Sequence, residues 1–381
     1  MSVTQPKPAP GHRAPYRAGQ VGSLLRPERL KQARASFHDE KSIGAEELRA
    51  VEDEEIAAAV RMQESVGMPE VTDGEFRRSF WHYDFLGGLE GVELIEQGEG
   101  IQFHGATTRA LHPVVMDRVR YAGHPMIADY EFLAGAARYS EPKVSIPAPS
   151  AAHFRLKPED LRHANYRDSL EAYFADLTDA FRQSVQGFYD AGCRYIQLDE
   201  VYIVYLCDPK IRQDWTDKGI DPDWLIDQYA AMIDGAVKDR PDNMVAAIHL
   251  CRGNFRSTFV AAGGYDPAAD ALFNKMDIDV YFMEYDDERS GGLEPLRLLP
   301  RGHKRVMPGF ITTKSGDMES VDDIARRIDA AAKFVPLDQL GIAPQCGFAS
   351  TEEGNDIAMD NQWRKLELVV KVAEKVWGSA L

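Results

Sequence analysis

Apolar and polar positions follow one recurring pattern along most of the chain. A short apolar run with strand character is followed by a polar or glycine-containing loop, and then by a stretch whose apolar residues repeat at helical spacing. In residues 45–67, for example, Leu48, Val51, Ile56 and Val60 share one helical face, and acidic residues occupy the other. Strand-like runs occur at residues 16–21, 70–72, 143–146, 195–198, 245–250, 280–283, 305–311 and 342–345.

This alternation predicts an α/β protein built as a (β/α)8 TIM barrel, because the strand-like runs are mostly followed by helices. We expect one domain over residues 16–381, larger than the usual ~250 residues of this fold. An open, doubly wound sheet is the alternative, but VGSLLRP after the first run is not a glycine-rich phosphate loop. The expected helices cover residues 27–35, 45–67, 166–191, 223–238, 266–275, 321–334 and 361–377.

Two segments depart from the pattern. Residues 81–138 are rich in glycine and carry alternating apolar residues such as Val114, Met116 and Val119, which predicts a β-hairpin-containing insertion after the second strand. Residues 1–15 combine proline and charge where a signal peptide needs an apolar stretch. We therefore expect a disordered N-terminal tail.

The composition is that of an acidic globular protein. Its 381 residues contain 44 Lys and Arg against 61 Asp and Glu, giving a net charge of −17, and 44% of them are hydrophobic. This charge argues against nucleic acids and anionic membrane surfaces as partners, because both need a basic face. No apolar run approaches the ~18–20 residues of a membrane span. Four cysteines are too few for a disulfide scaffold, so we expect a reducing, cytoplasmic setting.

Chemically capable side chains gather where the predicted strands end. In a barrel the active site lies at the carboxyl ends of the strands, so these residues are candidates for catalysis and binding. The number of polar and metal-binding types among them predicts an enzyme. They are Gly22, Ser23, Asp73, Glu75, Asp199, Glu200, His249, Cys251, Glu284, Lys314 and Cys346.

The segment His249-Leu-Cys251 is the sharpest of these features. Residues two apart on a strand point to the same side, so one short segment offers an imidazole nitrogen and a thiolate to one ion. Glu284 ends the sixth run and Cys346 the eighth. The four side chains together predict a tetrahedral Zn²⁺ site. The alternative is that the cysteines are small buried hydrophobes and the histidine a satisfied core residue.

Carboxylates at two strand ends are candidates for binding a cationic group. Asp199 and Glu200 are adjacent on a strand, so at most one of them can face the site. We expect that residue to bind a substrate ammonium or to orient a ligand. The alternative is an acid that caps the next helix. Glu75 follows Gly74, which permits a sharp turn. Ser23 and the neighbouring backbone amides offer a carboxylate site, with a simple turn as the alternative.

With these residues in place, the chain resembles the cobalamin-independent methionine synthase family, specifically its C-terminal zinc-binding barrel. The resemblance extends over residues 16–377 and rests on VGS, DGE, LDE, HxC, FMEY and PQCGF in this order. It implies that His249, Cys251, Glu284 and Cys346 bind zinc. It also implies that homocysteine is the thiol substrate, with Gly22 and Ser23 at its carboxylate and Glu75 and Asp199 at its amine.

The resemblance implies a zinc-dependent methyltransferase that moves a methyl group to the homocysteine thiol and yields methionine. Full-length members carry a second barrel, for which this chain has no room. The family's proton-donating histidine falls on Lys314. The family's folate-packing tryptophan has His153 and Phe154 as its nearest ring-bearing counterparts, and Trp81 is a further candidate for the donor pocket. The donor is therefore expected to be a folate or a methylated corrinoid, and Arg77, Arg78 and Lys314 are the cations available for an acidic donor tail.

Two other functions remain possible on the sequence. An epoxyalkane–coenzyme M transferase-like enzyme would use the same metal-bound thiol chemistry on another thiol, although coenzyme M has no ammonium group for Glu75 and Asp199 to bind. A non-catalytic zinc-binding barrel would keep the metal in a closed structural site without an open coordination position. The small-molecule thiol and its donor are the expected partners, and a homo-oligomer is possible.

Overall fold

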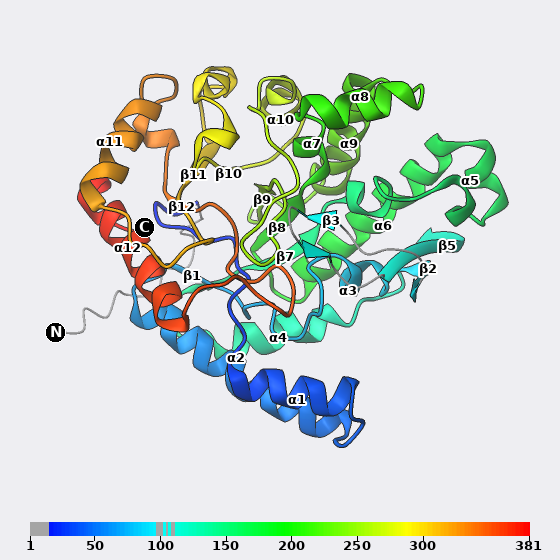
Figure 1. Ribbon diagram of the computed structural model, residues 1–381, viewed down its shortest axis with the longest axis horizontal. Helices are drawn as coiled ribbons and strands as arrows, with labels where there is room; N and C mark the ends of the chain where they lie inside the picture. The colour runs from blue at the N-terminus through cyan, green and yellow to red at the C-terminus, as the bar shows by residue number, and fades with distance from the viewer. Residues whose placement is uncertain (1–14, 97–101, 104–105, 108–110) are drawn as a thin grey trace.

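Parallel strands pair in the same order in which they follow one another along the chain. The computed structural model describes residues 15–96, 102–103, 106–107 and 111–381. In this part of the chain six strands form one parallel sheet. Helices surround the sheet on the outside, which gives an α/β fold (Figure 1). The strands are β7 (Val144–Pro147), β8 (Tyr195–Glu200), β9 (Val245–Leu250), β10 (Val280–Glu284), β11 (Arg305–Ile311) and β12 (Ala343–Pro344).

The register of the central strands positions the polar residues at one end of the sheet. Strands β8 and β9 are buried at every position, as expected for parallel strands covered on both faces. Asp199 lies opposite His249 in the β8–β9 ladder, and His249 lies opposite Phe282 in the β9–β10 ladder. Asp199, His249 and Glu284 therefore lie close to one another, at the carboxyl ends of β8, β9 and β10.

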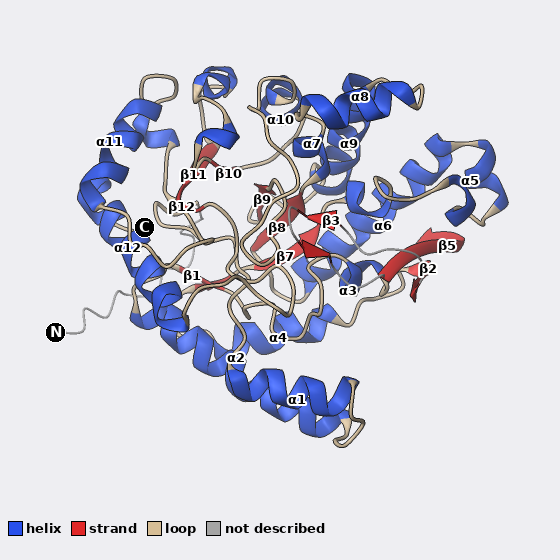
Figure 2. Cartoon of the chain, in the orientation of Figure 1, coloured by secondary structure: helices blue, strands red, loops and turns tan. Residues whose placement is uncertain are grey.

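Amphipathic helices cover the sheet (Figure 2). Helix α6, for example, buries Tyr173, Leu177, Phe181, Val185 and Phe188 on one face. No helix within the described ranges is long and apolar enough to cross a membrane. The helices are α1 (Glu28–His38), α2 (Ala45–Ser65), α3 (Tyr83–Leu86), α4 (Met126–Ala136), α5 (Ala164–Asp168), α6 (Leu170–Asp190), α7 (Tyr202–Tyr205), α8 (Pro209–Asp217), α9 (Pro222–Val237), α10 (Ala269–Asn274), α11 (Val321–Ala331) and α12 (Met359–Trp377).

The first predicted strand, at residues 16–21, is extended but forms no ladder. Its pairing is limited to one parallel bridge, between Ala18 and Ile342. A side chain takes the place of the neighbouring strand, because the backbone amide of Gln20 donates to Glu70 Oε1 at 2.9 Å. The sequence pattern records that a segment is apolar and extended, but it does not show whether its amides are satisfied by backbone or by side chains.

The second predicted strand is short. Strand β1 (Glu70–Val71) pairs in parallel with β6 (Glu141–Pro142), which is followed almost directly by β7. The buried Lys143 lies between β6 and β7, and its Nζ donates to Glu70 Oε1 at 2.8 Å. Glu70 thus accepts hydrogen bonds from both Gln20 and Lys143, and it ties three consecutive segments of the fold together.

Two further predictions differ in detail from the structure. The helix expected at 166–191 is divided into α5 and α6, because Ser169 is extended and its side chain accepts a hydrogen bond from the Ala172 amide as an N-cap. Within 81–138, β2 (Glu90–Glu96) pairs antiparallel with β5 (Leu111–Arg120), and β3 (Gln102–Phe103) pairs with β4 (Ala106–Thr107). Residues 1–14 of the predicted tail lie outside the described residues.

Candidate active site

Three of the predicted metal ligands come together at the carboxyl ends of β9 and β12. His249 lies on β9, Cys251 directly follows that strand, and Cys346 follows β12. His249 Nε2 is 3.4 Å from Cys346 Sγ, and the two sulfur atoms are 3.5 Å apart. One ligand atom from each of the three residues lies within 4.8 Å of the others, and all three side chains are buried. His249 and Cys251 come together because residues two apart along a strand direction point to the same side, and Cys346 joins them from the end of β12.

The geometry and chemistry of this cluster fit a zinc ion. Two sulfurs at the usual Zn–S distance of about 2.3 Å from a tetrahedral ion lie roughly 3.7 Å apart, close to the spacing observed here. His249 Nδ1 is buried without a hydrogen-bond partner among the described residues. The contact with Cys251 and the nearby His249 hold the pKa of Cys346 well below its usual range despite burial.

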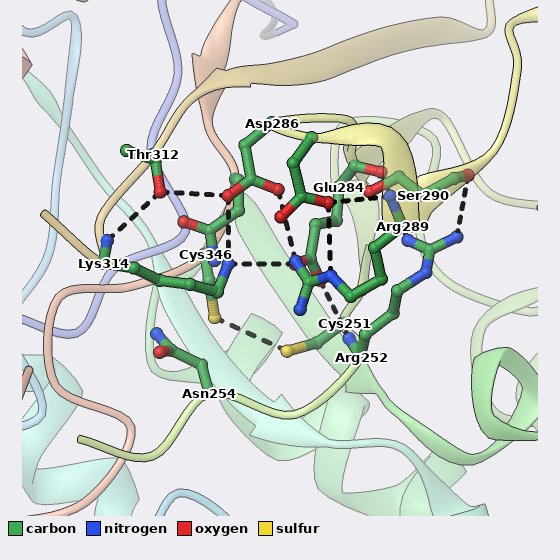
Figure 3. Close-up of polar contacts among 12 residues, drawn as sticks. Cys251, Arg252, Asn254, Glu284, Asp286, Arg289, Ser290, Thr312, Lys314 and Cys346 are labelled. Atoms are coloured by element: carbon green, nitrogen blue, oxygen red, sulfur yellow. Dashed lines mark hydrogen bonds and ion pairs between the residues drawn. The ribbon is translucent and has the colours of Figure 1, made fainter. Parts of the chain in front are cut away.

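Glu284, the fourth predicted ligand, is not part of this group. It ends β10 and is fully buried. Its Oε1 accepts hydrogen bonds from Lys314 Nζ at 3.1 Å and from Arg289, and its Oε2 accepts one from the Arg252 amide at 3.0 Å. Figure 3 shows this ion-pair cluster beside Cys251 and Cys346, whose sulfur atoms face each other. The sequence placed Glu284 correctly at the strand end but did not show which cations contact its carboxylate.

Lys314, the predicted proton donor, belongs to the same ion-pair cluster. Its Nζ lies 3.1 Å from Glu284 Oε1 and 3.0 Å from Asp286 Oδ2. Burial opposes the ammonium form, but the two carboxylates outweigh it and raise the pKa of Lys314 above its ordinary value. A lysine held in this way gives up its proton reluctantly. These contacts favour a structural role for Lys314 over proton donation.

The cluster opens into a cavity, named here the first cavity, that also contains the predicted amine-binding acids. Glu75 and Asp199 are both almost fully buried. Burial raises the pKa of Glu75 to about 7, with Asp199 contributing in the same direction, and burial also raises the pKa of Asp199. The first cavity is lined by Val21, Ser23, Glu75, Phe80, Trp81, His82, Arg155, Asp199, Val201, Tyr202, Tyr205, His249, Cys251, Gly253, Asn254, Cys346, Ser350 and Thr351.

The two acids have few partners of their own. Glu75 Oε1 accepts a hydrogen bond from Ser145 Oγ at 2.9 Å, and Glu75 Oε2 has no partner among the described residues. Asp199 Oδ1 accepts one from Gln197 Nε2 at 2.7 Å. Glu200 points elsewhere, since its carboxylate accepts hydrogen bonds from Ser150 Oγ and from the backbone amide of Ile203 near the start of α7. The pair of Glu75 and Asp199 is therefore available to a cationic group in the cavity.

Glu75 is held by an unusual turn. Its backbone lies in the left-handed region at φ 59°, directly after Gly74 at φ 68°. Such a conformation costs a non-glycine residue about 1–3 kcal/mol and persists only where the surroundings enforce it. Arg26 supplies this enforcement, because its guanidinium donates to the carbonyls of Glu75 and Arg78 at 2.8 and 2.9 Å.

Arg26 also binds the loop that carries Cys346. It donates to the carbonyls of Ala349 and Thr351 at 3.0 and 3.1 Å, and it is 3% exposed. Ser23 Oγ accepts a hydrogen bond from the Ala349 amide at 3.4 Å. Gly22 has φ 134°, a value that favours glycine. Ser23 thus lies against the Cys346 loop and at the cavity wall, whereas the carbonyl of Gly22 accepts a hydrogen bond from Thr72 Oγ1 at 2.6 Å.

The predicted donor-pocket residues lie at two different cavities. Trp81 lines the first cavity. His153 Nδ1 is 2.7 Å from the Tyr229 hydroxyl, and Phe154 stacks on Tyr202 with ring centroids 4.6 Å apart. His153 and Phe154 line a second cavity together with Leu161, Ile211, Trp215 and Val260. The structure therefore separates Trp81 from the two residues with which the sequence analysis grouped it.

Arg155 lines both cavities and was not singled out in the sequence. No carboxylate forms an ion pair with it in the described part of the chain, and its Nε has no hydrogen-bond partner there. The hydroxyls of Tyr202 and Tyr205 line the cavity next to its guanidinium. A cation in the middle of a loop carries no sequence signal that distinguishes it from a surface arginine. The other two cysteines, Cys193 and Cys207, are buried outside this site, and burial raises the pKa of each to about 12.

Comparison with known proteins agrees with this geometry. The chain matches the catalytic-domain model of the cobalamin-independent synthases over residues 17–375. It is 45% identical over 368 residues to the uncharacterized protein YxjH of Bacillus subtilis, covering 96% of both chains. It is 23% identical over 335 residues to a methionine synthase of Sulfolobus acidocaldarius, covering 86% of this chain and 84% of that one. The crystal structure of a putative vitamin-B12-independent methionine synthase from Listeria monocytogenes aligns with a TM-score of 0.78 and 36% identity, covering 97% of this chain and all of that one. This chain belongs to the cobalamin-independent methionine synthase family.

Proposed function

We propose that the protein is a zinc-dependent methyltransferase that converts homocysteine to methionine. One observation carries the proposal: a His–Cys–Cys cluster opens into the same cavity as two buried acids, Glu75 and Asp199. Arg78 forms an ion pair with Glu75 Oε1 at 3.8 Å, and Glu75 Oε2 has no partner among the described residues. A substrate that carries a thiol and, a few bonds away, an ammonium group would place its sulfur at the His–Cys–Cys cluster and its ammonium at the two acids. Family membership supports the same reaction class.

In this proposal His249, Cys251 and Cys346 hold the zinc ion. The chemistry that zinc supplies when bound is a lowered thiol pKa, which provides a thiolate nucleophile at neutral pH. Glu75 and Asp199 bind the substrate ammonium, and Ser23 with the backbone beside it binds the carboxylate. Anchoring both groups fixes the direction of the sulfur toward the donor. The sulfur then forms a bond to the methyl carbon as the bond between that carbon and the donor breaks, and the donor keeps the electron pair.

The elevated pKa of Glu75 makes amino-acid binding dependent on pH. With a pKa of about 7, ligand-free Glu75 is mostly protonated at pH 6 and mostly ionised at pH 8. An ammonium group binds the ionised form, so we expect the affinity for methionine to rise about tenfold from pH 6 to pH 8. Methionine is the suitable probe because it has no thiol to titrate. Isothermal titration calorimetry at pH 6, 7 and 8 measures the effect.

Two variants identify the group responsible. Glu75→Gln should bind methionine weakly and without this pH dependence. Glu141→Gln should keep both affinity and pH dependence, because Glu141 is a partly buried acid with a raised pKa that contacts Tyr16 instead of the cavity. A pH profile in Glu75→Gln that still matches the unmodified protein would show that the amine is bound elsewhere.

The charged residues that line the second cavity favour a methyl donor that carries anionic groups, such as a methylated folate. Its lining includes Arg155, Lys157, Arg167 and Lys218 against only Asp168 and Asp214, although the whole protein carries a charge of −17. The cations expected from the sequence are engaged elsewhere, since Arg77 contacts Glu52, Asp53 and Asp129, and Lys314 contacts Glu284 and Asp286.

A donor screen tests the proposed function directly. Zinc-loaded protein is incubated with homocysteine and, separately, with methyltetrahydrofolate, its triglutamate and methylcobalamin, and methionine is measured by mass spectrometry. We expect methionine from an anionic donor and a KM for that donor about tenfold higher in Arg155→Gln, because a partly buried cation that lines the cavity is removed. Arg182→Gln, on the exposed face of α6, serves as the control and should not change KM. Absence of methionine with every donor would contradict the proposal.

We propose further that residues 16–381 form one (β/α)8 barrel. Three contacts beyond the six-stranded sheet support closure: the ladder of β1 with β6, the bridge of Ala18 with Ile342, and the bond from the Gln20 amide to Glu70. Together they connect β12 through residues 16–21 and β1 to β6 and so complete a ring of segments. The β2–β5 hairpin then lies in the insertion that follows the second strand of the barrel.

A further inference from the structure

We propose that the Tyr205 hydroxyl is the proton donor of the methyl transfer: it protonates the nitrogen that the methyl group leaves, and Arg155 stabilises the phenolate that results. The inference rests on the proposed function and extends it to the leaving group. A methylated nitrogen is a poor leaving group, because without a proton it departs as an amide anion. A donor of this class therefore needs a general acid beside that nitrogen, and such acids typically contribute about 10²–10⁴-fold to the rate.

Tyr205 lies where the two cavities meet. Among the described residues, Tyr205 and Arg155 are the two that line both the first and the second cavity. The His–Cys–Cys cluster opens into the first cavity, and the cationic lining that favours an anionic donor belongs to the second. A methyl group that passes from a donor in the second cavity to a sulfur in the first must cross this junction. Tyr205 thus borders the place where the bond between the donor and the methyl carbon breaks.

Of the two residues at the junction, Tyr205 is the one whose proton can be transferred. The guanidinium of Arg155 keeps its proton at any working pH. A phenol is neutral at neutral pH, so it still carries its proton when the donor binds. Burial raises the pKa of Tyr205, and Arg155 opposes this effect by favouring the phenolate. The pair therefore combines a proton that stays in place before the reaction with a cation that stabilises the charge left afterwards.

The surrounding chain fixes the position of the phenol. Helix α7 follows β8 almost directly, and the Glu200 carboxylate accepts a hydrogen bond from the Ile203 amide at 2.7 Å. The rings of Phe154 and Tyr202 meet the Tyr205 ring edge-on, with centroids 5.9 and 5.6 Å away. Glu200, the acid that points away from the first cavity, thereby orients α7, and the two neighbouring rings restrict the rotation of the phenol.

The proposed step balances in atoms and electrons. The substrate thiol releases its proton to solvent when it becomes a thiolate. The sulfur forms a bond to the methyl carbon as the carbon–nitrogen bond breaks. The nitrogen keeps the electron pair of that bond, and the Tyr205 proton moves to the nitrogen. A proton from solvent restores the phenol after the products leave, so no oxidant, reductant or further reactant is needed.

Replacing Tyr205 with phenylalanine tests the proton transfer. In zinc-loaded Tyr205→Phe we expect kcat with methyltetrahydrofolate and homocysteine to fall at least a hundredfold, while the KM for the donor stays within about threefold. The calorimetric affinity for methionine should also stay within about threefold, which would show that the fold and the amino-acid site are intact. Tyr139→Phe makes the same substitution at an exposed position and should keep kcat. An unchanged kcat in Tyr205→Phe, or a loss of methionine affinity as large as the loss of kcat, would overturn the proposal.

Methylcobalamin provides a second test, because its cobalt keeps the electron pair and takes no proton. Where the unmodified protein accepts this donor, Tyr205→Phe should use it at a rate within about threefold. Equal losses of rate with both donors would assign Tyr205 to the fold and overturn the proposal. A protein that takes a methyl group only from methylcobalamin would overturn it as well, since no nitrogen would need a proton. Absence of methionine with every donor contradicts the proposed function itself, and the role of Tyr205 falls with it.

Discussion

Replacing Cys346 with alanine is expected to lower zinc affinity at least a hundredfold and to abolish methionine formation. Cys346 contacts both other members of the cluster, since its sulfur lies 3.4 Å from His249 Nε2 and 3.5 Å from Cys251 Sγ. The contact with Cys251 and the nearby His249 also hold the pKa of Cys346 well below its usual range. Zinc content is measured by mass spectrometry of the metal after dialysis, and methionine by the assay described above.

Cys207 offers a matched control for this experiment. It is a buried cysteine outside the cluster, its thiol contacts the Ile203 carbonyl, and burial raises its pKa to about 12. Cys207→Ala should therefore keep its zinc and its activity. Full zinc occupancy in Cys346→Ala would show that the cluster is not the metal site, and equal losses in both variants would point to general damage to the fold.

Replacing Arg26 with methionine is expected to lower the free energy of unfolding by about 3–5 kcal/mol. Methionine keeps an unbranched apolar stem but has no guanidinium, so it donates no hydrogen bond. Four buried carbonyls, those of Glu75, Arg78, Ala349 and Thr351, would lose the guanidinium that binds them. Each unsatisfied buried acceptor is costly, and the strained turn at Glu75 would lose its support. Urea unfolding followed by circular dichroism measures the difference.

The neighbouring Arg29 is the appropriate comparison. It lies on the exposed face of α1 and pairs with Glu54 and Glu55 in solvent. Surface ion pairs of this kind contribute little, so Arg29→Met should unfold at the same urea concentration as the unmodified protein. If Arg26→Met were as stable as Arg29→Met, the four carbonyl bonds would not be a principal support of this region.

The sequence predicts those parts of the site that depend on strand periodicity. His249 and Cys251 lie two apart at the carboxyl end of β9, and Cys346 is found at the expected end of β12. Asp199, rather than Glu200, lines the first cavity for the same reason. The parallel α/β architecture follows from the alternation of apolar runs with amphipathic helices.

Other features depend on pairings between distant side chains, which one sequence does not encode visibly. The carbonyls bound by Arg26 lie as far as 325 positions along the chain. The bond between Glu70 and the Gln20 amide substitutes for a strand ladder, so residues 16–21 look like a strand in sequence but form a single bridge. Glu284 is at the expected strand end, but its contacts with Arg289 and Lys314 depend on loop conformation and are not visible in the sequence. Its place in a zinc site stays a prediction.

The contacts of Arg26 have a consequence for how this enzyme class can diversify. One side chain joins the Glu75 turn to the Cys346 loop, so the thiol half of the site is built as a unit. The second cavity, by contrast, is lined mainly by residues 153–170 and 205–220, which none of the Arg26 bonds reach. Under the proposed function, substitutions or grafts there would change which molecule delivers the methyl group and would leave the thiol-binding half intact. The two parts of the site can therefore change independently, and the second cavity is the part in which substitutions are best tolerated.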